Sequence, residues 1–265
     1  MPPVRAFSTL GCPQAKLDEA LALAARHRLD GVELRALGGS ADLPAYLATQ
    51  YGSPAELAGK LGGRAARIIA LGSSLRAIDG TAADRAKFLE LVPWAEALGV
   101  RWLRVFDGGQ AADDAEIARA AETVRWWREL RAARGWRADI MIETHDAFIS
   151  TPAIRRFLTV SPEASLLWDS HHTWRKAGED PLATWSALHP RIVHVHIKDS
   201  IGAPGPRHPW TYVLPGSGEF PMASLLVELR NNFSGVLSLE WEKLWNPELP
   251  DLDDALRAAA DRRWW

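Results

Sequence analysis

The sequence alternates short apolar runs with longer amphipathic segments along its whole length. The short runs are rich in Val, Ile and Leu, as buried strands are, whereas segment 17–29 spaces apolar residues three and four positions apart, as a helix packed on one face requires. Eight strands are expected, at residues 4–8, 31–35, 67–71, 102–106, 139–143, 166–169, 192–197 and 236–240. Strand–helix alternation on this scale predicts an α/β fold, a single (β/α)8 TIM barrel that spans residues 1–265.

An open, doubly wound sheet is the alternative arrangement of such elements. The segment "STLGCPQAK" after the first strand lacks the G-x-G-x-x-G pattern of dinucleotide-binding folds, which favours the barrel. One long Pro- and Gly-rich stretch, "SIGAPGPRHPWTYVLPGSGEF", interrupts the alternation after the seventh strand. A loop of this length inside a compact domain is typical of a functional loop.

Composition narrows the class of protein. The net charge of −2 gives no general attraction to nucleic acid or to acidic membranes, and the single cysteine excludes a disulfide framework. We find no signal-peptide pattern and no apolar run long enough to span a bilayer, so a cytoplasmic enzyme is expected. Its partner would be a small molecule, and a homo-oligomer is compatible with the sequence, which leaves the oligomeric state open.

Acidic and imidazole side chains collect where the last four predicted barrel strands end. These side chains are Glu143 in "IMIETHD", Asp169 in "LLWDSHH", His196 in "VHVHIKD" and Glu240 in "LSLEWEK". In a TIM barrel the carboxyl ends of the strands open onto one face, so the four should converge. Three carboxylates and one imidazole predict one divalent metal ion; Mn²⁺, Mg²⁺ or Co²⁺ is favoured and Zn²⁺ is compatible.

Each of these residues also has a simpler interpretation. A lone glutamate at a strand end is usually solvated, and Asp169 could serve only to cap the next helix. His194 is expected to be a hydrogen-bonded core residue rather than a ligand. The metal site is predicted because four ligand-type residues end four consecutive strands.

Other polar residues near the strand ends are candidate substrate contacts. His145 and Lys198 each lie two positions beyond a predicted ligand and therefore on the same face, although Lys198 could equally form a salt bridge with a carboxylate. Glu33 and Arg35 end the second strand, where they would bind substrate hydroxyls or form an ion pair at the barrel rim.

The motifs at these positions resemble the xylose-isomerase-like TIM-barrel superfamily, which contains sugar phosphate isomerases and epimerases. The resemblance covers nearly the whole chain, and its most specific segments are "DGVELR", "IETHD", "WDSHH", "HVHIKD" and "GSGEFPMASLLVELRNNFSGVLSLEWE". Ketose 3-epimerases, hydroxypyruvate isomerase and inosose dehydratase are members that it is similar to. The resemblance implies that Glu143, Asp169, His196 and Glu240 bind the metal, that Glu143 and Glu240 are the catalytic acid and base, and that His172 binds substrate.

The sequence departs from the ketose 3-epimerases at one position. Those enzymes usually have an arginine six residues after the metal-binding histidine of the seventh strand, and here that position is Gly202. Arg207 would replace it as a substrate contact if the loop folds inward, and would otherwise be a surface residue. The departure argues against a specific assignment as a ketose 3-epimerase.

The residues support proton transfer beside a carbonyl group. A divalent cation would polarise a hydroxy-ketone and stabilise its cis-enediolate, while Glu143 and Glu240 remove and return the proton. The predicted function is therefore a metal-dependent sugar isomerase or epimerase that acts on a sugar or keto-sugar. Which glutamate is the base remains open.

Three other functions were weighed. A dehydratase acting on a keto-inositol or related keto-sugar would use the same groups. An apurinic-type endonuclease needs further histidines after the third and fourth strands, and "LGSSLRA" and "FDGGQ" supply none. A non-catalytic relative that binds a sugar would not need the full set of ligands.

Overall fold

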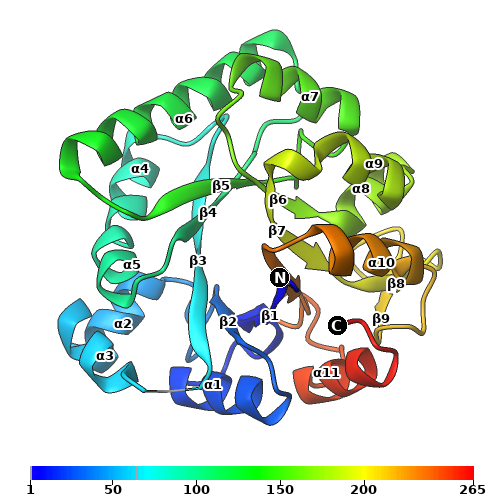
Figure 1. Cartoon of the computed structure of the whole chain (residues 1–265), viewed down its shortest axis with the longest axis horizontal. Helices are drawn as coiled ribbons and strands as arrows, with labels where there is room; N and C mark the ends of the chain where they lie inside the picture. Colours follow the sequence, from blue (N-terminus) through cyan, green and yellow to red (C-terminus); the bar gives the residue numbers. More distant parts are fainter. Residues whose placement is uncertain (1, 64) are drawn as a thin grey trace.

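The computed structural model describes residues 2–63 and 65–265 and contains a closed parallel barrel, with strands in the order β1-β10-β7-β6-β5-β4-β3-β2 (Figure 1). The barrel strands are β1 (Val4–Ser8), β2 (Gly31–Leu34), β3 (Arg67–Arg76), β4 (Trp102–Phe106), β5 (Asp139–Glu143), β6 (Leu166–Asp169), β7 (Ile192–Ile197) and β10 (Val236–Leu239). The predicted TIM barrel is confirmed. Five of the strands have the predicted bounds, whereas β2 and β10 end one residue earlier and β3 continues to Arg76.

Helices surround the barrel on its outside (Figure 1). They are α1 (Leu17–Arg26), α2 (Leu43–Tyr51), α3 (Pro54–Leu61), α4 (Ala82–Leu89), α5 (Val92–Leu98), α6 (Asp114–Arg134), α7 (Thr151–Val160), α8 (Ser170–Ala177), α9 (Pro181–Leu188), α10 (Met222–Asn232) and α11 (Leu252–Asp261). Helix α1 buries Leu17, Ala20, Leu21 and Ala24, the face that the sequence predicts. Within the described residues, no helix combines the length and the apolar character needed to cross a membrane.

Apolar side chains lie on both sides of the barrel wall. The larger core fills the space between strands and helices, where the buried Trp168 of β6 packs beside Trp185 of α9 with 6.2 Å between ring centroids. A smaller cluster of Ala70, Met141 and Leu167 fills the lumen. Because side chains alternate along a strand, the residue two positions beyond Leu167, Asp169, faces the lumen as well.

The long loop after β7 is ordered as a hairpin of β8 (Asp199–Ile201) and β9 (Thr211–Val213). Asp199 holds its base, because its carboxylate accepts hydrogen bonds from the backbone N–H groups of Ser200, Gly216, Gly218 and Phe220. Close packing at this point requires a glycine, since a Cβ on Gly218 would lie 2.2 Å from the Asp199 carboxylate. The stretch that the sequence marks as an interruption therefore has a defined structure beside the barrel mouth.

Candidate metal centre

Four buried side chains converge at the carboxyl ends of the barrel strands. Glu143 ends β5, Asp169 ends β6, His196 lies near the end of β7, and Glu240 directly follows β10. One ligand atom from each lies within 4.8 Å of the others. Ligands on opposite sides of a metal ion with bonds of about 2.0–2.2 Å are about 4–4.4 Å apart, so the cluster has the size of one coordination sphere.

The two carboxylate oxygens of Asp169 have different partners. Oδ1 accepts hydrogen bonds from the backbone N–H groups of His171 and His172 and so caps helix α8. Oδ2 points to the cluster, lies 2.8 Å from Lys198 Nζ and accepts no hydrogen bond that has good geometry. The capping interpretation and the ligand interpretation are therefore compatible, because each uses a different oxygen atom.

The orientation of His196 indicates where a cation would bind. Its Nε2 lies 2.8 Å from Glu33 Oε2, and its Nδ1 lies 3.3 Å from both Glu143 Oε1 and Glu240 Oε2, without a hydrogen-bond partner. Burial alone would lower the pKa of His196, but Glu240 and Glu33 raise it well above the usual value. A nitrogen lone pair next to two carboxylates is unfavourable, so this position needs a proton or a metal ion.

Glu33 fixes that orientation. Its buried carboxylate oxygen Oε2 also lies 3.0 Å from His194 Nε2. Burial opposes ionisation of Glu33, but the charges of His196 and His194 hold its pKa below the usual range. Metal-binding histidines commonly donate their second ring N–H to a carboxylate in this way. His194 is buried, as the sequence predicts, and contacts Glu33, but neither of its ring nitrogens has a hydrogen-bond partner of good geometry.

Two buried basic side chains contact the cluster. Arg104 Nη1 lies 3.3 Å from Glu143 Oε2, and both side chains are 1% exposed. Burial favours the neutral form of Glu143, yet the charge of Arg104 and the contact with His196 hold its pKa below the usual value. Lys198 Nζ contacts Glu240 and Asp169 and lies 2.6 Å from Glu242 Oε1. The salt bridge that the sequence leaves open for Lys198 is present.

The charges in this region fit a divalent cation. The carboxylates of Glu33, Glu143, Asp169, Glu240 and Glu242 face the basic side chains of Arg35, Arg104 and Lys198. Carboxylates outnumber cations by two, and burying two uncompensated negative charges is costly. The unpartnered Nδ1 of His196 faces Glu143 and Glu240, where a metal ion would bind. The residues present are therefore consistent with a divalent metal site.

His172 and His145 lie beside the cluster. His172 is buried, and its Nδ1 lies 3.2 Å from both Asp169 Oδ2 and the Thr144 carbonyl oxygen. His145 is about one-third exposed, and its Nδ1 lies 2.7 Å from Asp146 Oδ1. The two imidazole rings meet edge to face at 4.8 Å. Their assignment as substrate contacts stays a prediction.

Arg35 and Arg207 have different surroundings. Arg35 is 6% exposed and donates hydrogen bonds to the Ala41 carbonyl oxygen and Ser74 Oγ. Arg207 is exposed, and its hydrogen bond goes to the carbonyl oxygen of Trp245. The surface alternative for Arg207 matches this placement, and its role as a substrate contact stays a prediction.

Sequence reasoning missed Arg104 and the contacts of Glu242. Arg104 is the middle residue of the apolar strand "WLRVF", and an arginine inside a buried strand is itself a signal, because its charge needs a partner. Glu242 Oε1 accepts a hydrogen bond from Tyr212 OH at 3.0 Å as well as from Lys198. Tyr212 belongs to β9, so the hairpin supplies a side chain to the edge of the cluster.

Comparison with known proteins agrees with this arrangement. The family model described as xylose isomerase-like TIM barrel matches residues 21–264. The chain belongs to this family. No curated protein matches the sequence.

Solved structures of low sequence identity share the fold over nearly their whole length. The probable 3-DHS dehydratase AsbF of Bacillus anthracis, involved in petrobactin synthesis, has a TM-score of 0.76 at 18% identity, covering 99% of this chain and 100% of that one. The IOLI protein with a bound zinc atom has a TM-score of 0.75 at 18% identity, with coverage of 98% and 96%. A D-tagatose 3-epimerase-like protein has a TM-score of 0.67 at 15% identity, with coverage of 98% and 95%.

Proposed function

We propose that this family member is a divalent-metal-dependent isomerase or epimerase of a sugar or keto-sugar. The observation that carries the proposal is His196 Nδ1, which is held between the carboxylates of Glu143 and Glu240 without a hydrogen-bond partner. Glu143, Asp169, His196 and Glu240 would hold the metal. When bound, the cation would supply the positive charge that stabilises a substrate enediolate.

The protein side chains would carry the proton. Arg104 keeps Glu143 ionised, as a group that removes a proton from carbon must be. Glu240 contacts Lys198, whose ammonium group keeps that carboxylate ionised, so Glu240 is equally suited to remove the proton and to return it afterwards. Burial of the cluster excludes bulk water, which strengthens these charge interactions. Proton return to the same carbon would give epimerisation, and return to its neighbour would give isomerisation.

A dehydratase is the second candidate. Elimination of water needs a further group that protonates the leaving hydroxyl, and the half-buried His145, hydrogen-bonded to Asp146, provides one at the edge of the site. The likeness to a probable dehydratase is compatible with this candidate.

Solvent-proton exchange tests the proposal. The Mn²⁺-loaded protein is incubated in D₂O with a panel of ketoses, keto-acids and keto-inositols, and deuterium at carbon is followed by NMR. Deuterium incorporation that is lost in Glu143→Gln supports enediolate chemistry, and an accumulating enone would identify the dehydratase. Absence of exchange with every compound in metal-loaded protein would contradict the proposal.

A further inference from the structure

Arg35 is a buried guanidinium without a carboxylate partner. Its five N–H groups make two hydrogen bonds, to the Ala41 carbonyl oxygen at 3.3 Å and to Ser74 Oγ at 3.1 Å. Both acceptors are neutral, and within the described part of the chain no carboxylate forms an ion pair with Arg35. A buried arginine is normally paired with an anion, so this one requires an explanation.

A second guanidinium lies next to it. Gly72 of β3 separates the two side chains, and a Cβ on this glycine would lie 2.9 Å from Arg35 Cδ and 3.1 Å from Arg104 Nη2. The missing side chain allows two positively charged groups, one following β2 and one from β4, to pack over the same backbone segment. Arg104 Nε and Nη1 both lack a hydrogen-bond partner.

The two guanidinium groups therefore have few direct partners for their N–H groups. Glu143, at 3.3 Å from Arg104, is the carboxylate in ion-pair contact with this pair of arginines among the described residues, and it also belongs to the candidate metal site. Burial and the nearby charge of Arg104 lower the pKa of Arg35 to about 10, against the opposing charges of Glu143, Glu240 and Glu33. Two like charges held together away from water favour a bound anion.

We infer that Arg35 and Arg104 bind a carboxylate group of the substrate, so that the substrate is an acid, such as a sugar acid or keto-acid, rather than a neutral sugar. This inference rests on the proposed function, because it places the carboxylate beside the same metal centre. Arginine suits the role, since its planar fork matches the two oxygens of a carboxylate.

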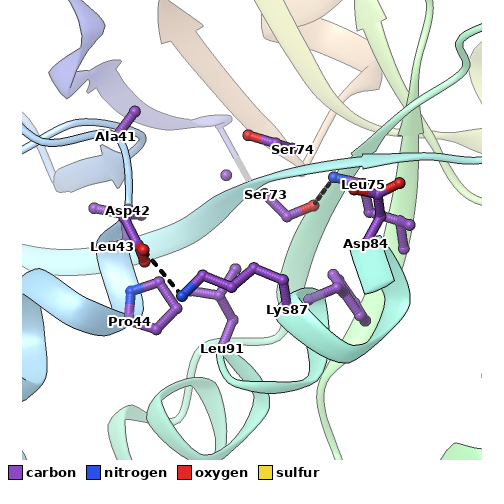
Figure 2. Close-up of a pocket in the computed structure, with 12 residues that line it drawn as sticks. Ala41, Asp42, Leu43, Pro44, Ser73, Ser74, Leu75, Asp84, Lys87 and Leu91 are labelled. Atoms are coloured by element: carbon purple, nitrogen blue, oxygen red, sulfur yellow. Dashed lines mark hydrogen bonds and ion pairs between the residues drawn. The ribbon is translucent and has the colours of Figure 1, made fainter. Parts of the chain in front are cut away.

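The pocket next to Arg35 is a less suitable place for the anion. It has a volume of about 300 Å³ and is lined in part by Ala41 and Ser74 (Figure 2). These two residues accept the hydrogen bonds of Arg35. Lys87, the cation among its described lining residues, is already paired, at 2.9 Å with Asp42 and at 2.7 Å with Glu90.

Asp84 lines the same pocket and adds a further negative charge. The carboxylate is therefore expected on the barrel side of Arg35, facing Arg104.

A matched pair of ligands tests the inference. D-Fructuronate and D-fructose differ only in having a carboxylate or a hydroxymethyl group at C6. Their dissociation constants are measured by isothermal titration calorimetry with Mn²⁺-loaded wild type, Arg35→Gln, Arg35→Lys and, as a control, Arg125→Gln, which changes an exposed arginine of α6. The metal content of each sample is measured in parallel.

We expect wild type to bind the acid at least about 10-fold more tightly than the sugar, because charge-assisted hydrogen bonds are the strong ones. Arg35→Gln should weaken binding of the acid about 10- to 100-fold, leave the sugar unchanged and retain its Mn²⁺. Arg35→Lys should fall between them, and Arg125→Gln should match wild type.

Two results would overturn the inference. The first is wild type that binds the acid no more tightly than the sugar. The second is Arg35→Gln that weakens binding of both ligands equally, which would make Arg35 a structural link between the loop at Ala41 and β3. Wild type that retains no Mn²⁺ would instead refute the proposed function. The comparison of acid with sugar would then be made on metal-free protein, since Arg35 has no hydrogen bond or ion pair to the four ligand residues.

Discussion

The substitution Glu33→Gln tests whether a residue that would not touch the metal controls its binding. Glu33 Oε2 faces the Nε2 atoms of His196 at 2.8 Å and His194 at 3.0 Å, and the side chain is 1% exposed. Glutamine keeps the size of the side chain but removes the charge that orients His196. Losing such a partner of a metal-binding histidine typically lowers metal affinity about 10- to 100-fold, which is about 1.4–2.7 kcal/mol.

The assay is a Mn²⁺ titration by calorimetry of wild type and Glu33→Gln. Glu129→Gln serves as the control because Glu129 is an exposed glutamate on helix α6, and this variant should bind Mn²⁺ as wild type does. Circular dichroism of each variant establishes that the barrel is intact.

An unchanged Mn²⁺ affinity in a folded Glu33→Gln protein would refute the reasoning. If the same variant raised the KM for substrate while metal affinity stayed constant, Glu33 would be a substrate contact, which is one of the two roles that the sequence allows for it. Oε1 of Glu33 has no hydrogen-bond partner in the structure, so that role has an atom available.

Two further predictions concern stability. Lys198→Met should lower the free energy of unfolding of the metal-free protein by about 3–5 kcal/mol in urea titrations, because it leaves three carboxylates without their cation. Mn²⁺ should stabilise the variant more than wild type. Equal stability of the metal-free variant and wild type would contradict this prediction. Asp253→Asn should cost about 1 kcal/mol or less at pH 7, because Asp253 joins α11 to His27, which follows α1, through a partly exposed hydrogen bond at 2.8 Å. Hydrogen bonds with His27 and Arg257 lower the pKa of Asp253 to about 2. The stability that Asp253 contributes is therefore complete above the unfolded-state pKa of about 4 and disappears as the pH falls through 2. A destabilisation by Asp253→Asn that does not shrink below pH 4 would refute this prediction.

Much of the barrel could be predicted because strand ends carry their own signals. In β6 an apolar run ends abruptly at Asp169, and the same change from apolar to polar ends β5 and β7. Strand β3 is the exception, because it continues beyond the predicted end at Leu71 to Arg76. Gly72 pairs with Arg104 and Arg76 pairs with Phe106 of β4, with a shift in register between them. Propensity is weak there, and the neighbouring strand decides the conformation.

The convergence of the four candidate ligands could be predicted from the sequence, but the contacts around them could not. Glu33 and His196 are 163 positions apart, and their hydrogen bond depends on barrel closure, which the sequence does not encode locally. Arg104 was missed because it lies inside an apolar strand rather than at its end. Its contact with Glu143 follows from two neighbouring strands whose lumen-facing residues meet at the barrel mouth.

The central claim is that Glu143, Asp169, His196 and Glu240 form one divalent metal site. Elemental analysis of protein purified without chelators or nickel tests it most directly, with Glu240→Gln as the variant and Glu248→Gln, at an exposed position, as the control. The account predicts about one Mn, Mg, Co or Zn ion per chain in wild type and in the control, and a clear loss in Glu240→Gln. Wild-type protein that holds no metal after incubation with excess Mn²⁺ would contradict it.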